Sequence, residues 1–272
     1  MHASASSFAA PLILLPFDAA TQAATHGSTH GPAQDQAAGL RALFARPCVR
    51  VLPVIVPSEH DQTRTVWLAK LAEAFARHGE RTLVLDTVRA QVGAAFGLRA
   101  RHDLEHALTG QCSLAAVTLD AAPGLCVMPA ARALEALPER TPLAPWLARA
   151  ATAAGCDLVL ALLPAARGRD LPAGDALVFV PADRHQLAAV LADVQVAASD
   201  SEITGFRLLF VGLEPAPALT LAARLAVKLR PSQATLHVAG AARVARDLAS
   251  VVRAAAGWNL ASLTLPEREM VG

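Results

Sequence analysis

The sequence predicts a single α/β domain built on a doubly wound, mainly parallel sheet that is flanked by helices. Short, continuous apolar runs alternate with stretches of helical periodicity along most of the chain. Such runs are typical of parallel strands that are buried on both faces, and strand–helix–strand repeats place helices on both sides of the sheet. A change of composition near residue 34 separates this part from an N-terminal segment rich in Ser, Thr, His, Gly and Pro.

The elements follow in order along the chain. The expected strands are the apolar runs Val49–Val56, Thr82–Asp86, Gly124–Pro129, Asp157–Pro164, Ala176–Pro181, Arg207–Gly212 and Ala234–Val238. Helical periodicity predicts helices at Thr65–His78, Leu143–Ala154, Asp183–Ala198, Pro217–Leu229 and Gly240–Ala255. Pro53 lies within the first run, where proline removes a donor from the strand ladder. We therefore expect the first strand to be shorter than its apolar run or disturbed in its pairing.

Composition excludes several classes of protein. A hydrophobic fraction of 54% with 17% charged residues describes a globular chain. The formal net charge of +1 leaves no global basic footprint for nucleic acid. No run reaches the roughly 18–20 uninterrupted apolar residues of a membrane span, and no lysine or arginine precedes Arg41 to begin a secretory signal. We expect a cytoplasmic protein.

Metal and nucleophile patterns are weak. The cysteines form no CxxC pair, which predicts reduced, buried thiols. His102, Glu105 and His106 match HxxEH, a pattern of some zinc peptidases. No third ligand is evident, and the short helix that we expect there lies away from the strand ends, so a solvated polar face is the favoured interpretation. No serine lies in a GxSxG context, and we predict no metal and no hydrolase.

The loop after the first strand occupies the usual phosphate cradle of a doubly wound sheet. It reads Ser58-Glu59-His60-Asp61-Gln62-Thr63-Arg64-Thr65, and a helix follows. With Leu83-Val84-Leu85-Asp86 as the next strand, this part resembles the MinD/ParA group of deviant Walker ATPases and implies a MinD-like P-loop NTPase fold. In that group the loop reads GKGGVGKT. Every glycine that would let backbone N–H groups turn around a phosphate is missing here.

The resemblance implies a vestigial nucleotide site at Glu59, Arg64, Thr65 and Asp86. Glu59 aligns with the signature lysine, and a carboxylate about 4 Å from a phosphate charge is repelled by about 4 kcal/mol at an effective dielectric of 20. Arg64 aligns with the loop lysine, Thr65 keeps the hydroxyl that would face magnesium, and Asp86 keeps the first carboxylate of an Asp-Ala-Asp pattern. Leu162 stands where the group's switch strand has an aspartate. We expect a pseudo-ATPase that binds neither ATP nor magnesium as a cofactor.

Upstream of the first strand, Asp35-Gln36-Ala37-Ala38-Gly39-Leu40-Arg41 has the DQAxxLR pattern, and Phe44 follows on the same side as Leu40. A DQAxxLR segment before a MinD-like domain resembles FlhG (also called FleN), the flagellar-number regulator. In that family the segment is a helix that activates the GTPase FlhF, and its glutamine assists GTP hydrolysis. The resemblance implies that Gln36 assists hydrolysis while Asp35, Leu40 and Arg41 position the helix. The competing interpretation is an ordinary amphipathic helix that packs on its own domain.

The resemblance extends from Asp35 to Leu229 and divides the chain into four parts. Residues 1–34 are a flexible tail, 35–46 the FlhF-activating type of helix, 47–265 the MinD-like domain and 266–272 a C-terminal tail. The last predicted helix, Gly240–Ala255, has Val244, Leu248, Val251 and Val252 on one face but no aromatic residue for membrane insertion. Packing against the sheet is favoured over peripheral membrane contact.

We therefore expect an inactive regulator of flagellar number or placement that binds an FlhF-type GTPase and acts near the inner-membrane face or the cell pole. Flagellar switch or export components are further expected partners. Two alternatives stay open. One is a MinD-like accessory protein of another envelope system, such as cellulose secretion. The other is a weak, unorthodox ATPase that uses Arg64, Thr65 and Asp86.

Overall fold

The computed structural model describes residues 48–56, 62–87, 91–138, 142–165, 167, 173–183, 186–200, 202–228 and 235–264. Its strands are β1 (Cys48–Val56), β2 (Thr82–Asp86), β3 (Leu119–Ala122), β4 (Leu125–Pro129), β5 (Leu158–Pro164), β6 (Gly174–Pro181), β7 (Ile203–Val211), β8 (Thr235–Ala242) and β9 (Ala261–Thr264). Its helices are α3 (Gln62–Arg77), α4 (Gln91–Ala95), α5 (Leu104–Leu108), α6 (Leu114–Val117), α7 (Ala131–Ala136), α8 (Ala144–Ala153), α9 (Leu187–Asp200), α10 (Pro215–Lys228) and α11 (Leu248–Ala255), and a 3-10 turn, η3, spans Ala245–Asp247.

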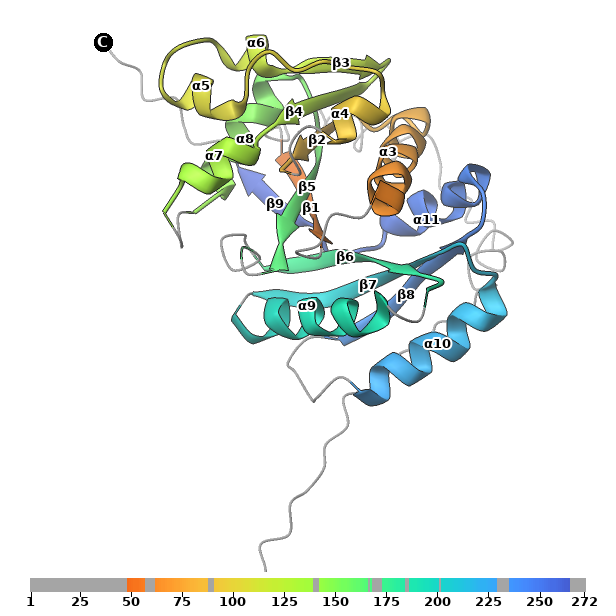
Figure 1. The fold of residues 1–272 in the computed structure, drawn as a ribbon. Coiled ribbons are helices and arrows are strands. Elements are labelled where there is room, and N and C mark those ends of the chain that lie inside the picture. The colour runs from red at the N-terminus through yellow and green to blue at the C-terminus, as the bar shows by residue number, and fades with distance from the viewer. Residues whose placement is uncertain are drawn as a thin grey trace, which may run out of the picture.

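The strands of the described residues form one sheet (Figure 1), in the order β3-β4-β2-β5-β1-β6-β7-β8, and β9 pairs with β1. The pairings are parallel except that β3 runs antiparallel to β4 and β9 runs antiparallel to β1. The first strand is therefore central, and α3 connects it to β2 on one side, while α9 and α10 connect the strands β6, β7 and β8 on the other. This arrangement confirms the predicted single α/β domain with a doubly wound, mainly parallel sheet.

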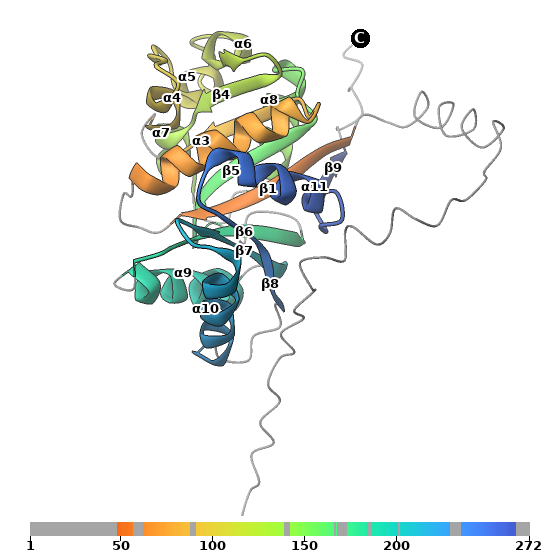
Figure 2. The same ribbon diagram turned by 90° about the vertical axis from the view of Figure 1, so that its right-hand side faces the viewer.

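Helices cover both faces of the sheet. On one face α3, α4 and α11 pack over a core that includes Leu68, Leu71 and Val251 (Figure 2). The other face carries two cores. One lies under α5, α7 and α8, and the other lies under α9 and α10. Because both faces are buried, the central strands are apolar at nearly every position, which is why they stand out in the sequence.

Pro53 marks the point where β1 changes partner. On one side, β1 pairs with β5 along Arg50–Val56. On its other side, Cys48–Val51 pair with β9, whereas Val54 and Ile55 pair with β6. Pro53 lies between these two partners, so the donor that proline lacks is not required on that side. Of the two outcomes expected for this strand, the disturbed pairing is correct.

The predicted helix at Gly240–Ala255 is wrong in its first half. Gly240–Ala242 belong to β8 and pair with Leu209–Val211, and the helix α11 begins at Leu248. Gly240 fits the strand because a side chain there would collide with Val251: an added Cβ would lie 2.7 Å from the Val251 Cγ2 atom. Leu248, Val251 and Val252 are buried against the sheet and α3, while Val244 lies outside the helix and is 45% exposed.

A buried ion pair links the end of the chain to the sheet. Asp175 on β6 is 3% exposed, and its Oδ2 atom accepts hydrogen bonds from the Arg207 Nε atom at 2.8 Å and the Asn259 N atom at 2.9 Å. The Arg207 guanidinium lies 5.7 Å from the centroid of the Trp258 ring. These contacts hold the connection between α11 and β9 against the amino ends of β6 and β7.

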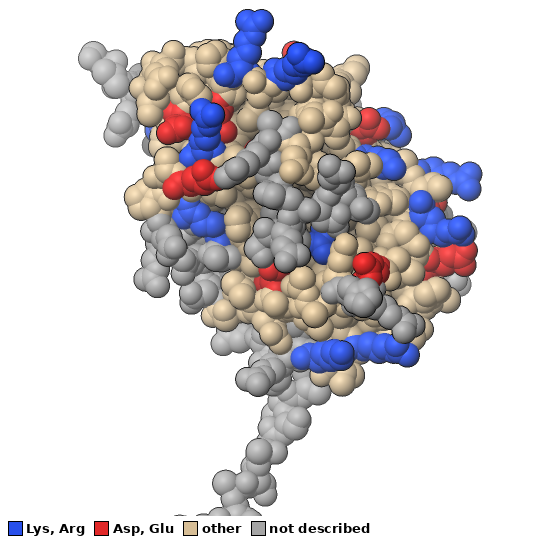
Figure 3. All heavy atoms as spheres, viewed as in Figure 1, with Lys and Arg blue, Asp and Glu red and all other residues tan. Residues whose placement is uncertain are grey.

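None of the helices in the described part of the chain is long and apolar enough to cross a membrane. Basic and acidic side chains are interspersed over the visible face of the molecule (Figure 3).

Candidate functional site

The candidate nucleotide site lies at the carboxyl ends of β1, β2 and β5, beside the first turn of α3. Parallel strands of a doubly wound sheet end together at this edge, and ligands bind there in proteins of this architecture. Residues 57–61 lie outside the described residues, and so does Glu59. The partner-binding residues Asp35, Gln36, Leu40, Arg41 and Phe44, and the predicted segments 1–34, 35–46 and 266–272, also lie outside them.

Arg64 and Thr65 are both in the first turn of α3. Their side chains are buried, with 5% and 8% of their surfaces exposed. The Thr65 hydroxyl donates to the Gln91 Oε1 atom of α4 at a long 3.4 Å. The positive charge of Arg64 also reaches α9: burial raises the pKa of the Asp193 carboxyl, and Arg64 opposes part of that shift. The cation and the hydroxyl that the sequence predicts therefore lie in the first turn of α3.

Asp86 ends β2 and caps α4. Its carboxylate is fully buried, and its Oδ2 atom accepts backbone hydrogen bonds from Val92 at 2.8 Å and from Gly93 at 3.3 Å. A carboxylate at a helix N-terminus stabilises the otherwise unpaired N–H groups of the first turn. The structure thus brings Thr65 and Asp86 to the same helix, because Thr65 contacts Gln91 while Asp86 contacts the next two residues.

Leu162 occupies the end of β5 with its side chain in the core. It is 1% exposed and belongs to the same apolar cluster as Trp67 and Leu68 of α3. The Thr87 hydroxyl donates to the Leu162 carbonyl oxygen at 2.8 Å, which joins the ends of β2 and β5. A leucine side chain can neither bind a metal ion nor hold a metal-bound water. The described part of the site thus contains the cation of Arg64, the hydroxyls of Thr65 and Thr87, and the carboxylate of Asp86, which is engaged in capping.

No protein-family model and no curated protein matches the sequence. Solved structures match over most of the chain. The MinC:MinD cell division protein complex of Aquifex aeolicus has a TM-score of 0.57 at 14% identity, covering 77% of this chain and 96% of that chain. The MinD cell division protein of Aquifex aeolicus has a TM-score of 0.54 at 14% identity, with coverages of 77% and 97%. A plasmid partition protein of Borrelia burgdorferi has a TM-score of 0.52 at 10% identity, with coverages of 75% and 97%. The chain has the MinD fold. At these identities the shared property is the fold.

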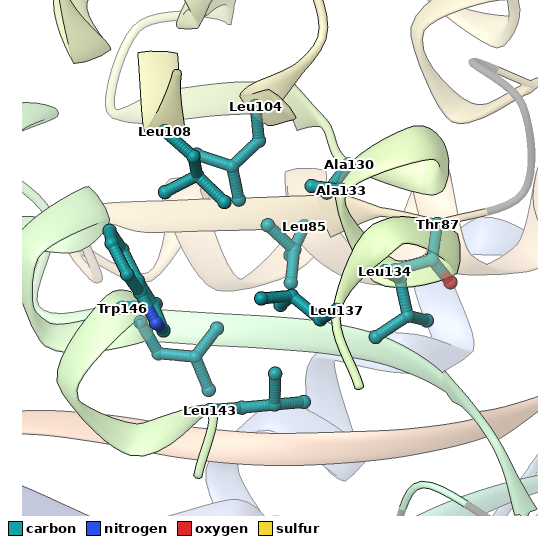
Figure 4. Close-up of a pocket in the computed structure, with 11 residues that line it drawn as sticks. Leu85, Thr87, Leu104, Leu108, Ala130, Ala133, Leu134, Leu137, Leu143 and Trp146 are labelled. Carbon is teal, nitrogen blue, oxygen red and sulfur yellow. The ribbon is translucent and has the colours of Figure 1, made fainter. Parts of the chain in front are cut away.

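Within this MinD fold, an apolar pocket lies beside the candidate site (Figure 4). It is enclosed by α5, α7 and α8, with Thr87 at one end and Trp146 at the other. The space inside is about 20 Å³, which is close to the space that a single water molecule needs. Its lining is leucine and alanine apart from Thr87 and Trp146. The pocket is therefore a packing gap of the core and is too small for a ligand.

The HxxEH residues take a different place in the MinD fold from the one that the sequence predicts. α5 begins at Leu104, so of the two histidines His106 lies on the helix and His102 precedes it. Their rings meet edge to face, with 5.4 Å between the ring centroids. Both line a hollow that includes Pro129, the last residue of β4. The expectation that they lie away from the strand ends is therefore wrong. In the described part of the chain, no group of three or more His, Cys, Asp or Glu residues is placed to bind a metal ion.

Proposed function

We propose that this protein is a catalytically inactive, MinD-like regulator that acts by binding a partner. The partner is an FlhF-type GTPase, and residues 35–44 are the segment that binds it. Through that GTPase the protein sets flagellar number or placement. It acts in the cytoplasm, next to the inner-membrane face or the cell pole, where flagellar switch or export components are further partners.

The observation that supports inactivity most strongly is the environment of Leu162. The side chain is 1% exposed and belongs to the apolar core that includes residues of α3, so the end of the switch strand provides core packing in place of a metal ligand. Asp86 supports the same conclusion because its Oδ2 atom already accepts two backbone hydrogen bonds. In the described part of the site, Leu162 stands at the end of β5 and offers no oxygen to a hard cation such as magnesium.

The partner segment is proposed from the sequence. Gln36 lies in the DQAxxLR pattern, directly before a domain of MinD fold. A glutamine amide is suited to orient an attacking water in the active site of a partner GTPase. In this mechanism the MinD-fold domain presents the helix, and no ATP-driven cycle is needed.

Calorimetry with ATP and magnesium tests the inactive site. We expect no heat of binding at high micromolar concentrations of ATP. Saturable binding together with release of phosphate would contradict the proposal and favour an unorthodox ATPase that uses Arg64 and Thr65.

The GTPase rate of the cognate FlhF, measured with and without this protein, tests the partner. We expect stimulation by the wild type and by Gln34→Ala, which changes a neighbouring glutamine outside the pattern, but not by Gln36→Ala. Equal stimulation by both variants would contradict the role of Gln36. Absence of both stimulation and a complex in size-exclusion chromatography would contradict the flagellar assignment and favour another envelope system.

A further inference from the structure

A second hollow at the carboxyl edge of the sheet lies one strand away from the candidate nucleotide site. It is formed by the segment Ala100–Asp103, by the end of β4 and by the first turn of α7, and its volume is about 400 Å³. Small-molecule sites typically measure roughly 300–1,000 Å³. Unlike the apolar pocket of Figure 4, this hollow is lined mainly by polar and charged side chains.

Neither arginine of the hollow forms an ion pair with a residue that the structure describes. Arg101 and Arg132 line it from two different segments, and both side chains are exposed. Among the residues that the structure describes, no carboxylate forms an ion pair with either guanidinium. Two unpaired guanidinium groups at one concave site attract an anion, because each offers a planar set of N–H donors that matches carboxylate or phosphate oxygens.

The two histidines add ring nitrogens to the same lining. The Nδ1 atom of His106 lies 3.1 Å from the backbone N atom of Asp103 and 3.2 Å from its carbonyl oxygen, at the capping box of α5. The Nε2 atom on the other side of the ring is the one that can meet a ligand. His102 stands at 5.4 Å from His106, measured between ring centroids, and is exposed at the same hollow.

Of the two acidic residues of the lining, Asp103 is held by backbone N–H groups. Its Oδ1 atom accepts from the backbone N–H groups of Glu105 at 3.0 Å and Ala133 at 3.1 Å, and Oδ2 accepts from that of Arg132 at 3.3 Å. Its charge therefore stabilises the N-termini of α5 and α7. The other acidic residue, Glu135 on α7, is exposed. The remaining polar side chains that can meet a ligand are those of the two arginines and the two histidines.

We propose that this hollow binds a small phosphate monoester, with Arg101 and Arg132 as the ion-pairing groups and His106 as a hydrogen-bonding group. A phosphate monoester carries about two negative charges near neutral pH, which matches two guanidinium groups. The site is separate from the phosphate loop at α3 and does not depend on the proposed pseudo-ATPase function.

Calorimetry of the full chain with glycerol 3-phosphate at low ionic strength tests this site, with inorganic phosphate and glycerol as companion probes. We expect saturable, millimolar binding of both phosphate compounds and none of glycerol. The double variant Arg101→Ala/Arg132→Ala should bind about tenfold or more weakly, because it loses two charge-assisted contacts. Arg224→Ala removes an exposed arginine of α10 and should bind like the wild type.

A second pair of measurements separates this hollow from the phosphate loop. Arg64→Gln should retain phosphate binding, and circular dichroism should show that each variant keeps its secondary structure. Loss of binding in a folded Arg64→Gln variant would place the anion at α3 and overturn the proposal. Unchanged affinity in the double variant, or no saturable binding by the wild type up to about 20 mM, would overturn it as well.

Discussion

At the scale of single residues, several buried carboxylates of this protein accept hydrogen bonds from backbone N–H groups. Asp86, Asp103 and Asp175 are all buried. Asp86 and Asp103 accept hydrogen bonds from backbone N–H groups at the starts of helices, and Asp175 accepts one from the backbone N–H group of Asn259, which is distant in sequence. A buried carboxylate loses its hydration, so these bonds are needed to offset the cost of burial. For Asp86 this is a second contact besides its predicted place in the vestigial nucleotide site.

Asp103 gives the clearest prediction of this kind, because one carboxylate caps both α5 and α7. Asp103→Ala should lower the free energy of unfolding by about 2–3 kcal/mol, since each lost cap costs about 1 kcal/mol and an unpaired N–H group adds to the loss. Urea denaturation measures the change. Asp247→Ala removes a half-buried carboxylate that accepts from the backbone N–H groups of Arg243 and Val244 and should cost less than about 1 kcal/mol. Equal losses in the two variants would contradict the double-cap role.

His237 on β8 predicts a dependence of stability on pH. Burial, and then the positive charge of Arg207, lower the pKa of His237, while Asp175 opposes part of the shift. The folded protein therefore binds this proton less readily than the unfolded chain, whose histidine pKa is about 6.5. The stability that the protein gains from keeping His237 neutral is fully present above about pH 6.5 and is lost as the pH falls below that value.

Urea denaturation at about pH 7.5 and about pH 5.5 measures this effect. We expect the wild type to lose more stability on acidification than His237→Gln, whose side chain does not titrate. Other groups titrate in both proteins, so the difference between the two losses is the relevant quantity. A loss in the variant as large as in the wild type would show that His237 does not contribute.

At the scale of elements, the parts that could be predicted are those with a strong local pattern. The central strands are buried on both faces and so read as apolar runs, and α3, α8, α9 and α10 are long enough to show helical periodicity. The helices α4 to α7 span four to six residues each, which is too short for a periodic signal. β9 and the far half of β8 depend on partners distant in sequence, and alanine and glycine there favour neither strand nor helix clearly.

The contact between β8 and α11 predicts a steric coupling. Gly240→Ala should destabilise the protein by about 1–3 kcal/mol, because the new methyl group would overlap the Val251 side chain in a packed core. Adding Val251→Ala makes room for the new methyl group. The loss in the free energy of unfolding of the double variant should therefore be smaller than the sum of the two single losses by at least about 0.5 kcal/mol. Gly257→Ala, with its nearest atom at 3.7 Å, is the control and should change stability by less than about 0.5 kcal/mol. Additive effects in the double variant would exclude the overlap.

At the scale of the whole molecule, the sheet brings two unlike sites to one edge. Arg64, Thr65 and Asp86 could be placed from the sequence because the first strand, its loop and the next strand follow each other in the chain. The capping of α4 by Asp86 could not, since α4 has no sequence signal. The hollow at Arg101 and Arg132 was missed because its walls come from segments about thirty residues apart, and only folding brings them together.

The final prediction concerns the response of the whole domain to nucleotide. A ligand that binds the folded state with a Kd of about 10 µM and is present at about 1 mM adds about 2.7 kcal/mol of stability, which raises Tm by roughly 5–10 °C in a domain of this size. Because Leu162 supplies no ligand and Asp86 is engaged with α4, we expect Mg-ATP to raise Tm by less than about 1 °C relative to magnesium alone. Glycerol 3-phosphate, which we expect to occupy the hollow at α7, should raise Tm slightly more than ATP does, because Arg101 and Arg132 pair with its phosphate there. A rise of several degrees with Mg-ATP that persists in Arg101→Ala/Arg132→Ala would show that the loop at α3 still binds nucleotide.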